Sequence, residues 1–466
     1  MPIDPENIGV YVCGPTVYDK IHIGNGRAMV VFDLLVRVLK QQYKNVTYVR
    51  NITDVDDKIN NAARQQSISI QEITKKTIKS FHQDVLQLNC LKPEVEPLAT
   101  KHIKEMINMI KKLVDNKNAY VVDNHVLFSV DSYDNYGGLS KRSVDELIAG
   151  MRISVADFKK NPADFVLWKP SDPEKLEPGW QSPWGFGRPG WHIECSAMSS
   201  KYLGVNFDIH GGGADLKFPH HENEIAQSCA ANPGSSYAKY WIHNGFVTVN
   251  GEKMSKSLNN FITVREILDE QSASNNINNY GQVIRLLLLN THYAKPLDWS
   301  DKSLQDAKKQ LDYLYTAIGN SDDEDSIEEN NEYNNAIDQD FINALNDDLN
   351  TPLAIARLLE MAKEINKLSN NTQKLQLGQK LKNSGMMIGI FARLTVDNKM
   401  EYVSSKEWFG QQDGESNEEI AQLITQITEA RLNKDYSTAD NIRDKLFNMG
   451  YIVEYKNDSS IKYKRK

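Results

Sequence analysis

Two short segments carry side chains that could bind a triphosphate. The first is His22-Ile23-Gly24-Asn25, which follows an apolar run at residues 8–13 and begins a helical pattern. In a sheet of parallel strands, phosphates bind where strands end and helices begin. His and Asn can donate hydrogen bonds to phosphate oxygens, and Gly lets the backbone approach a flat base. Taken alone, this segment is weak evidence for phosphate binding, because a His beside a Gly is more often a local helix cap.

The second segment is Lys253-Met254-Ser255-Lys256-Ser257, in a loop that begins with Asn250-Gly251. Two lysines bracketed by serines offer cations and hydroxyls to phosphate groups, without the fixed cradle of a P-loop. Composition alone favours a solvated basic loop. Between the two segments, a strand pattern ends in three glycines and Asp215, whose carboxylate could accept hydrogen bonds from the two hydroxyls of a ribose.

Four further side chains have the chemistry of a metal site. His220 and Glu224 are four positions apart, so on a helix both lie on one face. Cys13 ends the first strand pattern, and Cys195 belongs to the segment Trp191-His192-Ile193-Glu194-Cys195. Two thiolates, an imidazole and a carboxylate are a plausible zinc set, although no Cys-x-x-Cys spacing supports it. Three further donors lie close to these residues in the sequence and are either competing ligands or bystanders: His221, Glu222 and Cys229.

The elements that must position these residues follow a strand–helix–strand order. Residues 8–13 and 46–52 have strand patterns and residues 26–39 a helical one, which predicts a parallel, doubly wound sheet. Helices are predicted at residues 70–88 and 101–114, and a strand pair near 120–130 with Asp123-Asn124 at its turn. Residues 137–188 are rich in Gly, Pro and Asp, and strand signals return at 206–210 and 246–249. We therefore expect a Rossmann-type sheet that is split by an inserted connective region.

The C-terminal part has a different pattern. Apolar residues at helical spacing predict helices near residues 304–318, 351–368 and 372–391, which would form an α-helical bundle. Two further helices and the strands 451–455 and 461–463 predict a small α+β module. The two halves of the Rossmann domain are predicted at residues 1–100 and 189–250, with the insertion at 101–188 between them. A connecting segment with the lysine-rich loop follows at 251–302. The bundle is predicted at 303–400 and the C-terminal module at 401–466.

Composition narrows the class of protein. The chain has 466 residues, 40% of them hydrophobic, and four cysteines, which excludes a disordered, collagen-like or disulfide-stapled protein. No apolar run reaches the roughly 18 residues of a membrane span, and the first residues lack a secretory signal, so we expect a cytoplasmic protein. Cys90 and Cys229 are expected to be buried and reduced.

The net charge of −8 argues at first against a nucleic-acid partner. However, residues 321–350 hold eleven acids and no Lys or Arg, so the rest of the chain has a net charge of +3. We expect this acidic segment to be a solvated linker. The chain ends in a basic cluster, Lys462, Lys464, Arg465 and Lys466, which could bind phosphates.

The two phosphate segments, in this order, resemble the signature motifs of class I aminoacyl-tRNA synthetases, which activate an amino acid with ATP on a Rossmann-type domain. The usual second histidine of the first motif is Asn25 here, for which we expect an altered rate and not a loss of function. Residues 11–19, 50–58, 187–198, 218–224 and 347–352 resemble the cysteinyl-tRNA synthetase family. The resemblance runs from the first residues through the bundle, and more loosely to the end.

The resemblance implies roles for particular residues. Zinc would be held by Cys13, Cys195, His220 and Glu224, and the thiolate of the substrate cysteine would bind the zinc. The phosphates of ATP, accompanied by Mg²⁺, would contact His22, Asn25, Lys253 and Lys256. Gly24 would make room for adenine, Asp215 would bind the ribose, and Thr53 and Trp191 would line the amino-acid pocket. The insertion would approach the acceptor end of tRNA(Cys). The helical bundle and the C-terminal module, with Arg431, Arg443, Lys445 and the terminal basic cluster, would reach its anticodon.

Zinc would also explain how cysteine is distinguished from serine, which differs by one atom. Shape alone would reject serine by ~10²-fold, whereas leaving a strong polar partner unpaired gives ~10⁴-fold or more. Zinc is thiophilic and deprotonates a bound thiol. A separate editing domain is therefore unnecessary, and residues 101–188 look too short for one.

The expected activity is activation of L-cysteine by ATP and its transfer to the terminal adenosine of tRNA(Cys), by a monomer with no membrane association. Two alternatives stay open. One is an enzyme that joins cysteine to an amino-sugar by the same adenylation chemistry, and the other is a non-catalytic tRNA-binding paralogue. The long segment after the second motif favours tRNA over an amino-sugar, and the presence of Lys253, Lys256 and the four ligand positions argues against a non-catalytic protein.

Overall fold

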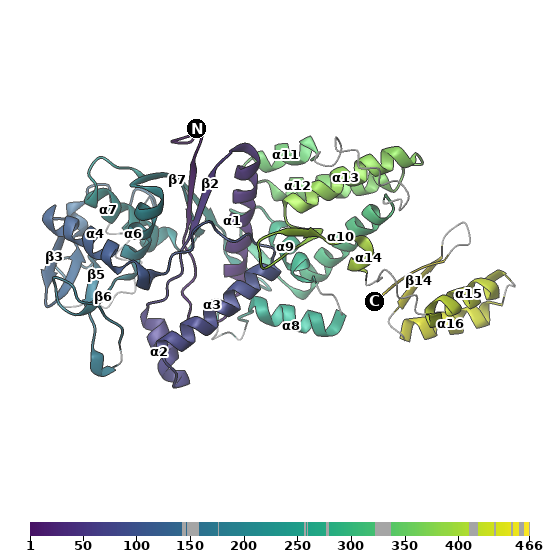
Figure 1. The fold of residues 1–466 in the computed structure, drawn as a ribbon, viewed down its shortest axis with the longest axis horizontal. Helices are drawn as coiled ribbons and strands as arrows, with labels where there is room; N and C mark the ends of the chain where they lie inside the picture. Colours follow the sequence, from purple (N-terminus) through teal and green to yellow (C-terminus); the bar gives the residue numbers. More distant parts are fainter. Residues whose placement is uncertain are drawn as a thin grey trace. The chain divides into compact units, whose positions relative to one another are not determined.

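The chain forms two compact units in a computed structural model (Figure 1). The first comprises residues 1–265, 288–301 and 344–352, and the second residues 266–287, 302–343 and 353–466. The structure describes residues 1–141, 146, 158–175, 177–255, 258, 260–275, 279–321, 337–409, 418–432, 435–448, 451–455 and 461–465.

A four-stranded parallel sheet organises the first unit. Its order is β2-β1-β7-β8, formed by Val46–Arg50, Ile8–Val12, Asn206–Gly213 and Tyr237–Asn244. All five residues of β1 are buried, as expected for a strand of a parallel sheet that is covered on both faces. Helix α1 (Ile23–Gln42) crosses from β1 to β2, so the predicted doubly wound α/β architecture is confirmed. Strands β2 and β7 lie on opposite sides of β1, so the strand order reverses at β1, the position where such sheets bind ligands.

The fourth strand of this sheet is not the one that the sequence predicts. Residues 247–249 form β9 (Val247–Val249), which joins β10 (Glu252–Lys253) and β11 (Leu297–Trp299) in a separate small sheet. The parallel sheet instead ends with β8, whose side chains Lys239 and Tyr240 are exposed. An edge strand needs less apolar surface than a central one, so β8 lacks the continuous apolar run on which the prediction relied.

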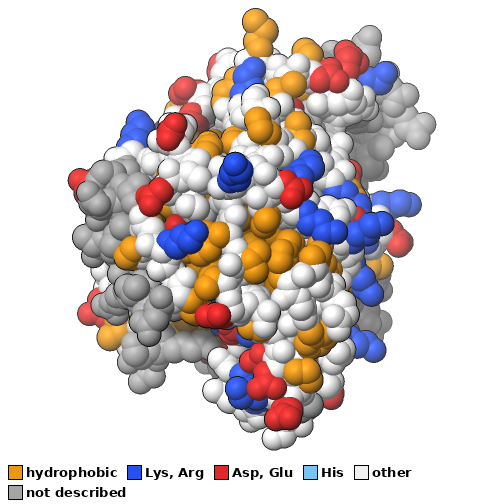
Figure 2. All heavy atoms as spheres, turned by 90° about the vertical axis from the view of Figure 1, so that its left-hand side faces the viewer, with side chains coloured by type: hydrophobic (Ala, Val, Ile, Leu, Met, Phe, Trp, Pro, Cys, Tyr) orange, Lys and Arg blue, Asp and Glu red, His pale blue; other side chains and the backbone are white. Residues whose placement is uncertain are grey.

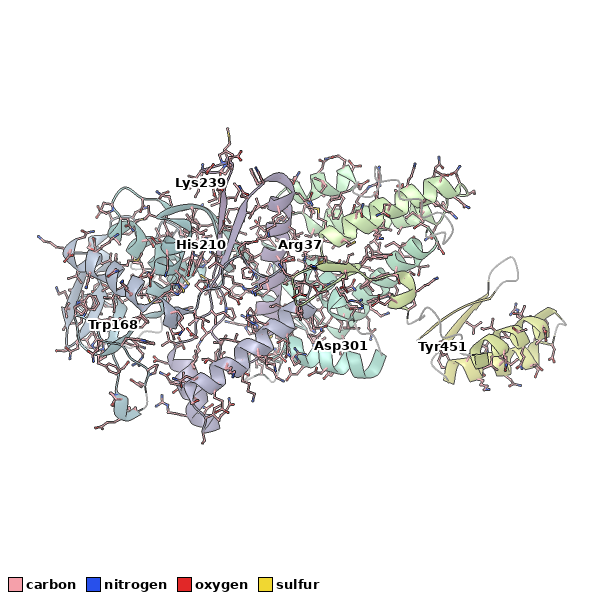
Figure 3. The ribbon with its side chains drawn as sticks, viewed as in Figure 1. Arg37, Trp168, His210, Lys239, Asp301 and Tyr451 are labelled. Carbon is pink, nitrogen blue, oxygen red and sulfur yellow. The ribbon has the colours of Figure 1, made fainter. Side chains whose placement is uncertain are left out.

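The inserted region builds a second sheet, of order β3-β4-β5-β6. Its antiparallel strands are Ala119–Val122, His125–Phe128, Phe165–Pro170 and Gly187–Pro189, and the predicted turn at Asp123-Asn124 is confirmed by two positive φ angles. Helices α4 (Ile103–Asp115), α6 (Trp191–Leu203) and α7 (Glu222–Ala231) gather beside this sheet (Figure 1). Figure 3 marks Trp168 on β5 and His210 on β7. On the outer face, apolar side chains gather centrally, with Lys and Arg along one flank (Figure 2).

One hydrophobic core joins the insertion to the parallel sheet. It includes Tyr11 of β1, Trp168 of β5, Ile193 of α6 and Tyr237 of β8, all of them buried. Helices α2 (Asp57–Gln66) and α3 (Ile70–Gln87) follow β2, and α2 is an element that the sequence patterns did not predict. All four cysteines are free, with Cys90 buried as expected and Cys229 only half-buried.

The second unit contains the predicted helical bundle and C-terminal module. Its helices and strands are α8 (Val264–Asn275), α9 (Gly281–Leu289), α10 (Asp301–Gly319), α11 (Gln339–Asn346), α12 (Thr351–Ile365), α13 (Asn371–Met387), β12 (Ala392–Leu394), β13 (Met400–Tyr402), α14 (Ser405–Trp408), α15 (Glu418–Leu432), α16 (Tyr436–Asn448), β14 (Tyr451–Tyr455) and β15 (Ile461–Arg465), some of which reach into the first unit at their ends. Among the described helices, none has the length and apolar character to cross a bilayer.

The expectation of a solvated acidic linker is wrong for residues 337–350. This part contains α11, and the carboxylate of Asp338 is buried against Arg357, with 3.0 Å between Oδ1 and Nε. A carboxylate that gains a guanidinium partner and a backbone donor, here Phe341 N–H, can be buried. Residues 322–336, which hold seven of the eleven acids, lie outside the described part of the chain.

Candidate active site and metal cluster

The four predicted metal ligands come together from three regions of the chain. Cys13 directly follows β1, Cys195 lies in α6, and His220 and Glu224 flank the start of α7, His220 in a short turn at Lys217–His221. All four side chains are buried, and their ligand atoms lie within 4.8 Å of one another. Cys13 Sγ is 3.6 Å from Cys195 Sγ and 3.5 Å from Glu224 Oε1, and His220 Nε2 is 3.1 Å from the same oxygen.

These distances fit a tetrahedral zinc site. With Zn–S bonds of about 2.3 Å and Zn–N or Zn–O bonds of about 2.0–2.2 Å, the edges of the ligand tetrahedron measure about 3.3–3.8 Å. The sulfur–sulfur and sulfur–oxygen distances fall in this range, and the nitrogen–oxygen distance is slightly shorter. The donors therefore match zinc in number and chemical type, and two of these three distances match its tetrahedral spacing.

The carboxylate of Glu224 is oriented by two side chains that the sequence patterns did not reveal as its partners. Glu224 Oε2 accepts a hydrogen bond from Tyr237 Oη at 2.8 Å and lies 2.9 Å from His210 Nε2, which leaves Oε1 facing Cys13 and His220. Burial opposes ionisation of this carboxyl group, but the neighbouring His210 and His220 outweigh it and lower the pKa of Glu224. The group is thus held as a carboxylate, the form that binds a metal.

His220 is enclosed by aromatic rings. The ring of Trp191 stacks on the ring of His220 with centroids 4.1 Å apart, and Nδ1 of His192 lies 2.9 Å from Nδ1 of His220. Burial lowers the pKa of His220 to about 4, so the imidazole is neutral at pH 7, as a metal ligand must be. Burial also raises the pKa of the Cys13 thiol well above its ordinary value in the metal-free protein.

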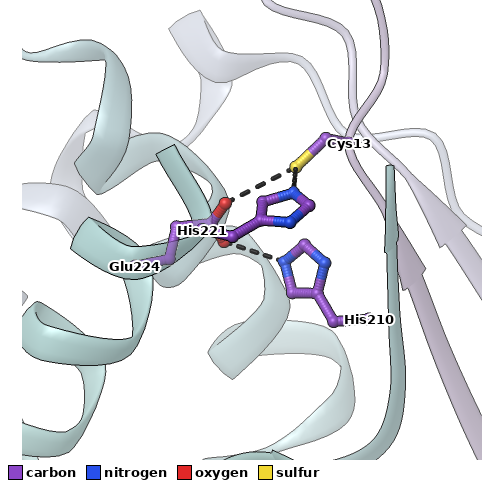
Figure 4. A group of neighbouring side chains, drawn as sticks. All are labelled: Cys13, His210, His221 and Glu224. Atoms are coloured by element: carbon purple, nitrogen blue, oxygen red, sulfur yellow. Dashed lines mark hydrogen bonds and ion pairs between the residues drawn. The ribbon is translucent and has the colours of Figure 1, made fainter. Parts of the chain in front are cut away.

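A second set of four donors shares Cys13 and Glu224 with the first. It adds His210 and His221, and Figure 4 shows these four side chains converging. His221 Nε2 lies 3.4 Å from Cys13 Sγ, while its Nδ1 is 2.8 Å from Nε2 of His243. The sequence had marked His221 as a competing donor, and the structure places it at the cluster. The first set contains two thiolates instead of one, which suits a soft, thiophilic ion such as zinc better.

At the first phosphate segment, the structure shows a helix cap. Nδ1 of His22 accepts hydrogen bonds from the backbone N–H groups of Gly24 and Asn25 at 3.1 and 3.3 Å, and Asn25 Oδ1 accepts one from the backbone N–H of His22. A neutral imidazole that accepts at Nδ1 carries its proton on Nε2. A Cβ atom on Gly24 would lie 2.9 Å from ring atoms of His22, so the cap depends on this glycine.

The second phosphate segment lies beside the first. A Cβ atom on Gly24 would be 3.6 Å from Met254 Cε, and Ile23 N–H donates to the carbonyl of Ile262 at 3.0 Å. Lys253 is exposed at the end of β10, whereas Lys256 lies outside the described residues. Asn260, which the sequence analysis missed, bridges the loop: its Oδ1 accepts from Ser255 N–H at 2.8 Å and its Nδ2 donates to the carbonyl of Lys253 at 3.2 Å.

The remaining predicted residues lie where the parallel strands end. Asp215 is exposed in the turn after β7, and its Oδ1 would be 2.3 Å from a Cβ atom on Gly213. Thr53 follows β2, is buried, and donates a hydrogen bond to Glu194 Oε2 at 3.0 Å. Trp191 begins α6 and is 39% exposed, so one face of its ring remains available beside the metal cluster. The first phosphate segment, the carboxylate of Asp215 and the cluster of candidate ligands thus share one edge of the sheet.

The chain is similar to known proteins over its whole length. Residues 1–309 match the family model "tRNA synthetases class I (C) catalytic domain", and residues 340–392 match the "DALR domain". The cysteine--tRNA ligase of Ehrlichia canis is 50% identical to this chain over 468 residues, covering 100% of this chain and 97% of that protein. The cysteine--tRNA ligase of Wolbachia sp. subsp. Drosophila simulans is 50% identical over 462 residues, with coverages of 99% and 96%.

Solved structures show the same fold at low sequence identity. Methionyl-tRNA synthetase of Mycobacterium tuberculosis, in complex with methionyl-adenylate, superposes with a TM-score of 0.57 at 13% identity, covering 82% of this chain and 89% of that one. The LeuRS of Agrobacterium radiobacter, in a ternary complex with tRNA, superposes with a TM-score of 0.56 at 12% identity, with coverages of 84% and 86%. The predicted Rossmann-type catalytic fold is confirmed by these likenesses.

Proposed function

Because the chain belongs to the cysteine--tRNA ligases, a family of class I aminoacyl-tRNA synthetases, we propose that it activates L-cysteine with ATP and transfers the cysteinyl group to the terminal adenosine of tRNA(Cys). The observation that carries this assignment is the buried set of two sulfurs, one nitrogen and one oxygen beside the nucleotide segments. A thiol-selective metal at that position matches cysteine as the substrate.

We assign the metal to Cys13, Cys195, His220 and Glu224. Zinc bound there would coordinate the substrate thiolate and so reject serine. The protein's own contribution is to fix the ligands: Tyr237 and His210 hold Glu224, and Trp191 covers His220. Thr53, which is tied to Glu194, and the exposed face of Trp191 would line the amino-acid pocket.

For the nucleotide, the protonated Nε2 of His22 and the amide of Asn25 are the proposed hydrogen-bond donors to phosphate. Since the Oδ1 of Asn25 already caps the helix, its Nδ2 remains the donating atom on the ligand side. Lys253 and Lys256 would neutralise the charge that develops on pyrophosphate, with Mg²⁺ accompanying ATP. Gly24 would leave room for adenine, and Asp215 would accept hydrogen bonds from the ribose hydroxyls. Positioning and charge stabilisation perform the catalysis, and no covalent enzyme intermediate is needed.

For tRNA, we propose that the insertion approaches the acceptor end, and that the bundle and the C-terminal module approach the anticodon. The likeness to cysteine--tRNA ligases extends over the whole chain, bundle included, which supports tRNA as the acceptor and disfavours an amino-sugar. Of the candidate contacts, Arg443 is already paired with Asp440 at 2.8 Å, so it is a weaker candidate than its charge alone implies. We propose a monomer that acts in the cytoplasm.

Aminoacylation of purified tRNA(Cys) tests these assignments directly. With cysteine, ATP and Mg²⁺ we expect charging that a zinc chelator abolishes and zinc restores, and with serine we expect no charging. Charging of an amino-sugar but not of tRNA would instead favour the alternative ligase. Cysteine-dependent ATP–pyrophosphate exchange separates a catalytic protein from a tRNA-binding paralogue, because only the former supports it.

A further inference from the structure

The helix that carries Glu224 is also attached to the insertion, through a buried carboxylate with no role in the mechanism above. Glu222 is 1% exposed, and its two oxygens accept backbone hydrogen bonds from a loop of the insertion at residues 137–140. Gly137 N–H donates to Oε1 at 2.9 Å and Ser140 N–H donates to Oε2 at 2.8 Å, while Leu139 N–H makes a longer contact of 3.4 Å.

The two sides of this short segment face different partners. On a helix, positions 220 and 224 lie on one face and position 222 lies almost opposite. Accordingly, His220 and Glu224 point to the metal cluster, whereas Glu222 points to the insertion. The next residue adds a second attachment, because Asn223 Oδ1 accepts a hydrogen bond from Tyr136 Oη at 2.5 Å.

The loop is shaped to meet this carboxylate. Gly137 has a φ of +95°, a conformation that other residues adopt rarely, and its amide is one of the two close donors to Glu222. Ser140 Oγ donates to the carbonyl of Gly137 at 3.2 Å, which closes the loop on itself. Replacing the carboxylate with a glutamine amide would leave one of the two close N–H groups, of Gly137 or Ser140, facing an NH2 group instead of an acceptor, and such losses are costly.

We propose that Glu222 is a positioning residue that couples the order of the loop at residues 136–141 to metal binding at His220 and Glu224. Holding the loop fixes the start of α7, and fixing the start of α7 sets the two ligands at the separation that the metal requires. Because a coupling free energy is reciprocal, metal binding must stabilise the loop by the same factor by which the loop improves metal affinity. The inference rests on the metal site assigned under the proposed function.

The test compares Glu222→Gln with a matched control in the full-length protein. Asp164 is also a buried carboxylate in the insertion that accepts backbone hydrogen bonds, from Val130 and Asn161 at 2.9 and 3.1 Å, but it lies on no element that carries a ligand. Zinc affinity is measured by competition with a chromophoric chelator. We expect Glu222→Gln to weaken zinc binding by roughly 10- to 100-fold, the range found for groups that orient metal ligands, and Asp164→Asn to leave it unchanged.

Amide hydrogen exchange of the wild-type protein provides a second measurement that needs no variant. Addition of zinc should slow exchange at Gly137 and Ser140 and leave Val130 and Asn161 unaffected. Equal zinc affinity in the wild-type and Glu222→Gln proteins, or no zinc-dependent change at Gly137 and Ser140, would overturn the coupling and leave the metal site standing. If the wild-type protein binds no zinc, the metal assignment itself fails, so the two failures are distinguishable.

Discussion

Arg27 offers a sharp test of how the two nucleotide segments are held together. This side chain of α1 is fully buried, and its guanidinium donates to the carbonyls of Gly245 and Phe246, both at 3.0 Å, and of His292 at 3.1 Å. Residues 245–246 lead into β9 and β10, the strands that carry Lys253. Arg27 therefore connects the helix that begins at the first segment to the strands that precede the second.

Replacing Arg27 with Met preserves the apolar stem and removes all three hydrogen bonds. The bond to Gly245 is buried and the other two are partly buried. A buried carbonyl left without a donor costs about 1–3 kcal/mol, so the first unit should lose at least about 1 kcal/mol of its free energy of unfolding. Arg27→Lys keeps the charge but lacks the planar fork that reaches three carbonyls, so its loss should be intermediate. The exposed Arg64→Met on α2 is the control, with an expected change within about 0.5 kcal/mol.

Urea unfolding followed by tryptophan fluorescence measures the stability, and ATP–pyrophosphate exchange measures the function. Under conditions where both variants remain folded, exchange should fall in the order wild type, Arg27→Lys, Arg27→Met, because the strands carrying Lys253 lose their attachment to α1. If Arg27→Met unfolds at the same urea concentration as the wild-type protein, or if Arg27→Lys is as stable and as active as wild type, the three hydrogen bonds do not have the role assigned to them.

Three further predictions concern the metal, the second nucleotide segment and the acidic segment. Metal analysis should find one zinc per wild-type chain and a loss of bound zinc in Cys195→Ser, so full occupancy in that variant would falsify the ligand set. Lys256→Ala should slow cysteine-dependent exchange by orders of magnitude, and near-normal exchange would refute its role in neutralising pyrophosphate. Burial opposes ionisation of Asp338, but hydrogen bonding to Arg357 outweighs burial and lowers the pKa of Asp338 in the folded protein. The carboxylate therefore contributes its full stabilisation above the unfolded-state pKa of about 3.9. This stabilisation is lost as the pH falls through the lower pKa of the folded state. Asp338→Asn should therefore destabilise the second unit at pH 7 and remove part of the acid sensitivity of its unfolding, which circular dichroism can follow; an unchanged acid transition would contradict this assignment.

The chemistry of the site was predictable from sequence where residue type and local spacing were sufficient. The order of strand, helix and strand placed Cys13 and His22 at the same edge of a parallel sheet, and the separation of four positions placed His220 with Glu224. The partners of Glu224 were not predictable in this way. Tyr237 lies at the start of an edge strand that has no clear apolar pattern, and neither it nor His210 forms a recognisable spacing with Glu224.

The prediction of a solvated acidic segment was wrong for a related reason. A count of charges describes a segment as a whole, whereas burial of Asp338 depends on one arginine nineteen positions later in the chain. Likewise, Glu222 stood in the sequence as a competing metal donor, and only the three-dimensional placement of the loop at residues 137–140 shows that its oxygens are occupied elsewhere. Long-range hydrogen bonds of this kind leave no periodic signal in the sequence.

The single core that runs from β1 through the insertion has a consequence for how this protein can be divided. The insertion begins and ends at recognisable positions in the sequence, yet Trp168 and Phe128 of its sheet pack in the same cluster as Tyr11 and Tyr237 of the parallel sheet. A truncation or exchange at the sequence boundaries 101 and 188 would expose both halves of that cluster to water. The parallel sheet and the insertion should therefore fold and unfold as one cooperative unit. Sequence changes that preserve function are expected within the insertion and not at its borders.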